Sequence, residues 1–211
     1  MIQYRKNPTV RLGSGRGFSL LEVLVTIVIL SVGLLGLAGL QGRALTAQME
    51  SYQRSQAMVL LKDMADRIDL NRKNAASYVT TGLTPAYLGV GASCNATCNA
   101  SGVCNTTANT DLCAWNNALQ GTSEKLAASA VGAMIDARGC VYQTTAPASG
   151  VAETYSIVVA WRGLNYTFAP DIVTATSAGK CGYNLYTDKS GASVERLHRV
   201  ISLPIAMADL L

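Results

Sequence analysis

The clearest pattern in the chain is an apolar run from Phe18 to Leu40 that holds one charged residue, Glu22. A helix of this length and composition is long enough to cross a lipid bilayer. A carboxylate inside such a helix is costly, so it usually has a partner and a function. The run therefore predicts a membrane-length helix in which Glu22 takes part in an interaction.

The helical pattern continues beyond the apolar run, as an amphipathic stretch over residues 41–73. We expect one helix over residues 18–73, with its second half packed in part on a globular head. Apolar side chains recur in this half at spacings of three and four, which places them on one helix face: Met58, Leu61, Ala65 and Ile68.

Four glycines interrupt the apolar region at every third residue: Gly33, Gly36, Gly39 and Gly42. Each glycine costs ~1 kcal/mol relative to alanine inside a helix, so the series predicts a locally weak helix. The alternative is close packing against another helix, which small residues permit in membranes. A spacing of three drifts around the helix instead of lining one face, and this favours the weak helix.

The sequence after the helix predicts a head domain over residues 74–211. Residues 80–113 are rich in Gly, Ala, Asn, Thr and Cys, and predict an irregular loop pinned by disulfides. Asp111 is a candidate cap for a short helix in which Leu112, Trp115 and Leu119 share a face. A second short helix is expected within residues 124–137.

The pattern then changes to a period of two, which predicts an antiparallel sheet over residues 139–205. One long helix, then a variable loop, then a sheet is an order that predicts an α+β fold, in which the sheet packs on the helix. Strands are expected over residues 139–145, 153–162 and 196–205, a shorter strand over 183–187, a turn over 144–150 and a loop over 170–181. Alternating apolar residues mark the two strongest strands: Tyr155, Ile157, Val159 and Trp161, then Leu197, Ile201, Leu203 and Ile205.

Charge in this chain is concentrated before the apolar run. The formal net charge is +4, from 17 basic and 13 acidic residues. Residues 1–17 hold four of the basic residues and no acidic one, which leaves 13 of each sign in the rest. No basic stripe with interleaved aromatic residues follows, so the sequence argues against nucleic-acid binding.

The basic segment also predicts topology. Basic residues before the helix keep that end in the cytoplasm, and the rest of the chain is then expected outside the inner membrane. In an ordinary secretory peptide the small-residue cleavage site follows the apolar region. Here the glycine junction at Gly17 precedes the apolar region, which would be retained.

Six cysteines, all outside residues 1–73, agree with that compartment. An even set of cysteines outside the cytoplasm predicts disulfides, although six cysteines allow 15 pairings. Zinc binding is the alternative, but paired Cys-x-x-Cys knuckles are absent. The candidates are Cys94, Cys98, Cys104, Cys113, Cys140 and Cys181.

The segment Gly17-Phe18-Ser19-Leu20-Leu21-Glu22, placed after a basic leader, resembles the class III signal of type IV prepilins. The resemblance implies that residues 1–17 are a leader, that a prepilin peptidase cuts between Gly17 and Phe18, and that Phe18 is then N-methylated. It also implies that Glu22, fifth after the cut, acts in assembly. The alternative is a plain membrane anchor with a chance glycine.

Several further segments resemble the PilV family of minor pilins: residues 17–25, residues 33–41, Trp161-Arg162-Gly163 and Arg199-Val200. Gly39 stands where many major pilins have proline. The resemblance implies a minor pilin that primes pilus assembly and sits at the tip, with other minor pilins, the major pilin and a tip adhesin as partners. The alternative is a minor pseudopilin of a type II secretion system.

Enzymatic function finds little support in the sequence. His198 is the only histidine, and on a strand it is expected to be a packed or surface residue. There is no Gly-x-Ser-x-Gly elbow and no phosphate-binding loop. We therefore expect no catalytic, cofactor or metal site, with a membrane-anchored periplasmic hydrolase as the remote alternative.

Overall fold

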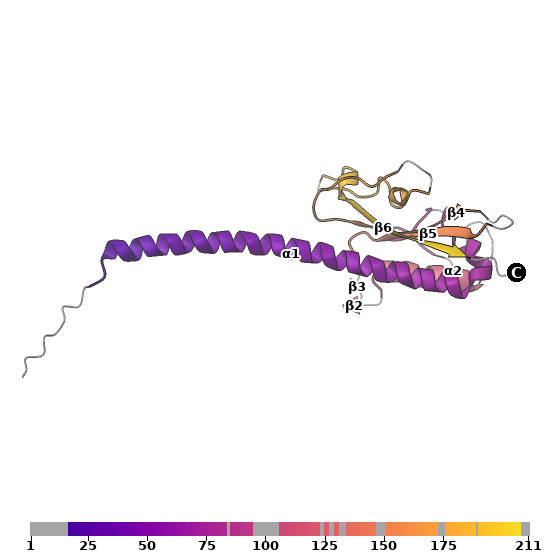
Figure 1. The fold of residues 1–211 in the computed structure, drawn as a ribbon, viewed down its shortest axis with the longest axis horizontal. Coiled ribbons are helices and arrows are strands. Elements are labelled where there is room, and N and C mark those ends of the chain that lie inside the picture. The colour runs from indigo at the N-terminus through magenta and orange to yellow at the C-terminus, as the bar shows by residue number, and fades with distance from the viewer. Residues whose placement is uncertain are drawn as a thin grey trace, which may run out of the picture. The chain divides into compact units, whose positions relative to one another are not determined.

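The computed structural model of the chain divides into two compact units, residues 1–45 and residues 46–211, described separately below. Figure 1 shows the ribbon. Most of the predicted leader lies outside the described residues. Those residues are 17–83, 85–94, 106–122, 125–126, 129–130, 134–146, 151–172, 176–188 and 190–207.

Two α-helices, three short 3₁₀ helices and six strands make up the described part of the chain. The helices are α1 (Leu20–Leu70), η1 (Arg72–Tyr78), α2 (Thr106–Leu119), η2 (Ala178–Lys180) and η3 (Glu195–Leu197). The strands are β1 (Leu88–Gly89), β2 (Lys125–Leu126), β3 (Ser129–Ala130), β4 (Arg138–Thr145), β5 (Glu153–Arg162) and β6 (His198–Met207).

The first unit contains the N-terminal part of α1, and every described side chain in it is exposed. By length and composition α1 is able to cross a membrane. The helix runs without a break through Gly33, Gly36, Gly39 and Gly42, and a methyl group added at any of them would touch nothing within 4 Å. In the single chain these glycines therefore do not interrupt the helix, and their weakening effect stays a prediction.

The predicted long helix is confirmed, and its buried face differs slightly from the predicted one. Leu61 and Ile68 are buried as expected, but Met58 is 57% exposed. The buried seam of α1 consists of Gln53, Ala57, Leu61, Met64 and Ile68. Met58 and Leu61 are three residues apart, so they lie close together on the helix surface. The face that packs on the sheet nevertheless includes Ala57 instead of Met58, which is its neighbour in the sequence.

The second unit is built on a four-stranded antiparallel sheet in the order β1-β4-β5-β6. The predicted alternation on β5 is confirmed, because Tyr155, Ile157, Val159 and Trp161 are all buried in one cluster with the α1 seam. Central register pairs are Val141 with Ile157 and Ile157 with Leu203. The α+β fold, a long helix packed on an antiparallel sheet, is thus as predicted.

The opposite face of the sheet is also covered in part. Cys140 and Val158 lie there in a second buried cluster with Cys181 and Tyr186 from the segment before β6. Tyr142 on β4 belongs to the same cluster. β6 is an edge strand and contains Pro204, which lies opposite Ser156.

The connection before the sheet corrects two predictions. α2 begins at Thr106, so Asp111 lies inside the helix and is not its cap. Tertiary packing overrides the weak helix propensity of the Thr- and Asn-rich start, because the buried residues form one seam. That seam is Ala108, Leu112, Trp115 and Leu119.

Residues 125–126 and 129–130 pair as β2 and β3, so the helix expected within residues 124–137 is wrong there. Residues 183–187 form no strand, and one isolated bridge joins Thr187 to Ser193. Leu197 belongs to η3 and not to the last strand. The strands predicted at 139–145 and 153–162 are confirmed, whereas residues 147–150 of the predicted turn lie outside the described residues.

A polar network fixes α2 against the end of α1. Arg67 Nη1 lies 2.9 Å from Asp111 Oδ1, and the Tyr78 hydroxyl donates to Asp111 Oδ2 at 2.5 Å. The Trp115 indole N–H donates to the Leu60 carbonyl at 2.9 Å. Gly139 permits the approach of β4, since a Cβ there would lie 2.4 Å from the Trp115 ring.

Two tyrosines make the folded head sensitive to alkali. Burial, followed by the hydrogen bond to Asp111, raises the pKa of Tyr78 to about 12, and burial alone raises the pKa of Tyr142 to about 12. In the unfolded chain both hydroxyls ionise near pH ~10. The folded state therefore favours the neutral phenols, and their contribution to stability is complete below pH ~10 and is lost as the pH rises toward 12.

We predict that the head unfolds cooperatively as the pH rises through this window. Tyr142→Phe removes one of the hydroxyls that must ionise, so it should move the midpoint of alkaline unfolding to higher pH. Circular dichroism of the full chain in detergent, together with tyrosinate absorbance, measures this. The exposed residue Tyr183 provides the control Tyr183→Phe, and equal midpoints for the two variants would contradict the prediction.

Candidate assembly site

The first turn of α1 carries one carboxylate, that of Glu22. Residues 17–19 are not helical, and the Ser19 carbonyl accepts bonds from the Glu22 and Val23 amides at 3.0 and 3.3 Å. The positive end of the helix dipole favours the negative charge of Glu22 in this first turn. Within the described residues Glu22 forms no ion pair, and Phe18 is 84% exposed.

The residues that follow Glu22 expose an almost continuous apolar surface. Removing such side chains from water is favourable by ~1.5–3 kcal/mol each, so a surface of this extent requires an apolar environment. The large exposed residues are Val23, Leu24, Val25, Ile27, Val28, Ile29, Leu30, Val32, Leu34, Leu35, Leu37 and Leu40.

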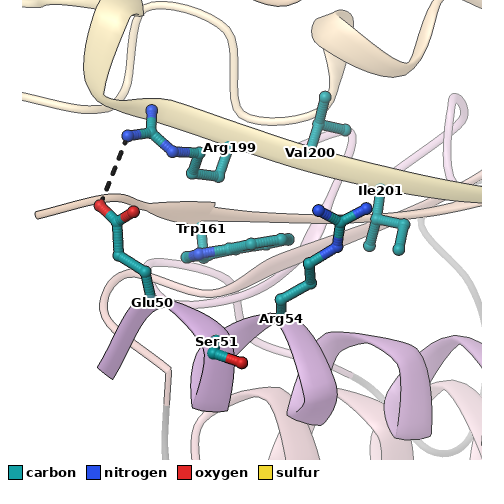
Figure 2. Close-up of a pocket in the computed structure, with 7 residues that line it drawn as sticks. All are labelled: Glu50, Ser51, Arg54, Trp161, Arg199, Val200 and Ile201. Carbon is teal, nitrogen blue, oxygen red and sulfur yellow. Dashed lines mark ion pairs between the residues drawn. The ribbon is translucent and has the colours of Figure 1, made fainter. Parts of the chain in front are cut away.

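In the second unit, a clamp centred on Glu50 joins α1 to β6 and to the segment that follows β5. Figure 2 shows the ion pair of Glu50 with Arg199. The Glu50 carboxylate accepts hydrogen bonds from the Leu164 and Asn165 backbone amides, at 3.2 and 3.1 Å. It also pairs with Arg199 on β6 at 3.6 Å. One side chain thus ties together a helix, a strand and a loop.

Arg199 reaches this clamp by lying flat over a glycine. A Cβ at Gly163 would lie 2.6 Å from Arg199 Cζ, so only glycine leaves room for the guanidinium. From there Arg199 donates to the Arg196 carbonyl at 3.1 Å and to the Asn165 carbonyl. The dipeptide Arg162-Gly163 and residue Arg199, which are distant in sequence, are therefore one structural unit.

A cleft of about 370 Å³ lies beside the clamp, and Figure 2 shows the flat ring of Trp161 between its two arginines. Arg54, unlike Arg199, has no ion-pair partner among the described residues. The lining residues are Glu50, Ser51, Arg54, Trp161, Arg199, Val200 and Ile201.

Two of the segments that resemble PilV proteins, Trp161-Arg162-Gly163 and Arg199-Val200, meet at this cleft, since Trp161, Arg199 and Val200 all line it. Glu50 was missed by sequence reasoning. It is the only acidic residue between positions 41 and 60, and this isolation is the one feature of the sequence that could have drawn attention to it. Its partner Arg199 lies on the last strand, so no local pattern could connect the two.

The predicted disulfides are confirmed for four cysteines. Cys94 pairs with Cys113 on α2, and Cys140 on β4 pairs with Cys181. Their Cα–Cα distances are 5.3 and 5.8 Å. Cys98 and Cys104 lie outside the described residues. Among the described residues no cysteine is free and no cluster suited to a metal ion occurs.

His198 is a packed residue in the described structure. Its ring stacks on Tyr186 with centroids 4.6 Å apart, and its Nδ1 lies 2.9 Å from Glu195 Oε2. Burial lowers the pKa of His198 below its ordinary value, although the bond to Glu195 opposes the shift. The side chain is almost fully buried and faces no cleft described above.

A long helix with an exposed apolar start, packed on a four-stranded antiparallel sheet, is the fold of the pilin class. A family model described as type IV pilin Tt1218 matches residues 39–145, about half of the chain, and the chain belongs to this family. The prokaryotic N-terminal methylation motif matches residues 14–38, which include Gly17, Phe18 and Glu22. No curated protein and no solved structure gave a significant match.

The clamp predicts a specific effect of Gly163→Ala. The new methyl group displaces the Arg199 guanidinium, which breaks its contacts with Glu50 and Asn165 and costs about 1 kcal/mol of head stability. Amide hydrogen exchange at Leu164 and Asn165 should become faster. The exposed β6 residue Ser202 supplies the control Ser202→Ala, and unchanged exchange in Gly163→Ala would show that the clamp does not hold the loop.

Proposed function

We propose that this type IV pilin is a minor pilin of the PilV kind that helps to prime pilus assembly in a tip complex with other minor pilins. The observation that carries the proposal is the exposed apolar start of α1, with Glu22 unpaired within the described residues and a methylation motif across the same residues. An apolar surface of this kind is stable only when lipid or other helices cover it and keep it out of water.

The proposed mechanism uses the same surface twice. In the inner membrane, α1 stores the subunit as a single-pass protein with its head in the periplasm. In the pilus, the apolar surface packs against neighbouring pilin helices. Weakening at Gly33, Gly36, Gly39 and Gly42 would ease the change of environment, because each glycine lowers the stability of the helix interior.

Glu22 supplies the guiding interaction in this proposal. An ionised carboxylate in hydrocarbon costs a few kcal/mol even on permissive scales, so a cationic partner stabilises it. The proposed partner is the α-amino group of Phe18 on a neighbouring subunit, after cleavage at Gly17 by a prepilin peptidase. The helix dipole contributes a smaller share of the compensation.

The PilV assignment rests on the segments at the clamp and on the N-terminal segment. The other proposed partners are the major pilin and a tip adhesin. A minor pseudopilin of a type II secretion system would share the N-terminal segment. Neighbouring genes for minor pilins and a large tip adhesin support the first assignment, and genes for a secretion system support the second.

Processing provides the first test. Mass spectrometry of the mature protein should show a chain that begins at N-methylated Phe18. Replacing Gly17 by a bulky residue should leave the leader attached, whereas Gly17→Ala serves as the conservative control. A chain that still begins at Met1 in a piliated cell would contradict the proposed processing.

Glu22 provides the second test. Glu22→Leu should leave cleavage and membrane location unchanged, but it should reduce incorporation into the tip complex, since the partner amine loses its counter-charge. Co-purification with other minor pilins measures incorporation, and Glu22→Gln separates the charge from the shape of the side chain. Undiminished co-purification of both variants would remove Glu22 from the mechanism.

A further inference from the structure

One loop of the head displays aromatic side chains that its own fold does not cover. Residues 164–168, called the aromatic loop below, follow β5 directly. Leu164 is 42% exposed, Tyr166 is 55% exposed and Phe168 is 98% exposed. Phe18 and Phe168 are the only phenylalanines in the chain, and both point into solvent in the isolated subunit.

This exposure does not come from a loosely held segment. Glu50 binds the Leu164 and Asn165 amides, and the Thr167 amide donates to the Arg196 carbonyl at 2.8 Å. Arg199 adds a bond to the Asn165 carbonyl. The backbone on both sides of Tyr166 is therefore fixed, and the fold holds the aromatic side chains outward.

A shortage of core space does not explain the exposure either. The head buries most of its large aromatic side chains, including Tyr78, Trp115, Tyr155 and Trp161. Outside the aromatic loop, only Tyr52 and Tyr183 are exposed among the described aromatic residues of the second unit. An exposed, positioned phenylalanine beside a tyrosine marks a contact surface, because such side chains gain most when they leave water.

The charges around the aromatic loop are of both signs, with more arginines than carboxylates. The Arg196 guanidinium lies over the Tyr166 ring at 5.7 Å. Arg162 and Asp188 line the cleft of about 530 Å³ that also contains Leu164 and Tyr166. Arg162 and Arg54 form no ion pair among the described residues. Aromatic rings combined with arginines suit the headgroup layer of a membrane, where rings sit at the interface and cations meet anionic lipid.

We propose that the aromatic loop binds the membrane interface while the subunit is stored, with Phe168 and Tyr166 among lipid headgroups and the nearby arginines at anionic lipid phosphates. The inference rests on the proposed membrane location of α1. It adds a second membrane contact, made by the head, that must be released when the subunit leaves the bilayer.

Photo-crosslinking in the full chain tests this contact. The protein carries Phe168→p-benzoylphenylalanine and is reconstituted in vesicles of phosphatidylethanolamine and phosphatidylglycerol. Mass spectrometry then identifies the adducts formed on illumination. Tyr183→p-benzoylphenylalanine, at another exposed aromatic position of the head, is the matched control. Leu30→p-benzoylphenylalanine reports whether α1 itself is in the lipid.

We expect lipid adducts at Leu30 and at Phe168, with severalfold less at Tyr183. Adding Glu50→Ala should reduce the lipid adduct at Phe168 severalfold and leave that at Leu30 unchanged, because the loop loses its anchor. Adducts at Leu30 without adducts at Phe168 overturn the inference alone, as do adducts from Phe168 to a second protein chain. Absence of lipid adducts at Leu30 overturns the proposed membrane location, and the inference with it.

Discussion

The head depends on the contact between one face of α1 and the inner face of β5. Ala57, Leu61, Met64 and Ile68 meet Tyr155, Ile157, Val159 and Trp161 in a single buried cluster. This contact gives the helix a packed half, and it positions β4 and β6 through the register of β5. Since a four-stranded sheet with one uncovered face would leave these side chains in water, the helix is part of the core and not an addition to it.

Polar contacts then set which parts of the head are held close to α1. Near the end of α1, Asp111 pairs with Arg67 and accepts a hydrogen bond from Tyr78. Some 17 residues earlier along α1, Glu50 pairs with Arg199 and accepts hydrogen bonds from two loop amides. Burial lowers the pKa of Arg67, but its bonds to Asp63 and Asp111 outweigh this and raise the pKa overall. The two fixed points lie near the two ends of the buried seam.

The fold was largely predictable because its main signals are periodic. The apolar run, the helix continuing past it and the alternation on β5 each repeat over many residues, so small local deviations do not hide them. The start of α2 was missed because Thr and Asn are weak helix formers that tertiary packing overrides. The Glu50 clamp could not be predicted, since its members lie more than 100 residues apart and become neighbours only when β6 returns to α1.

Pro204 has a consequence for how copies of this subunit can meet. An edge strand ordinarily offers a row of backbone donors and acceptors to any other strand, which is how sheets join without control. Proline supplies no amide hydrogen, so the row along β6 is interrupted near its middle. Heads that lie close together are thereby discouraged from pairing their sheets through β6, so this edge does not extend one sheet into the next.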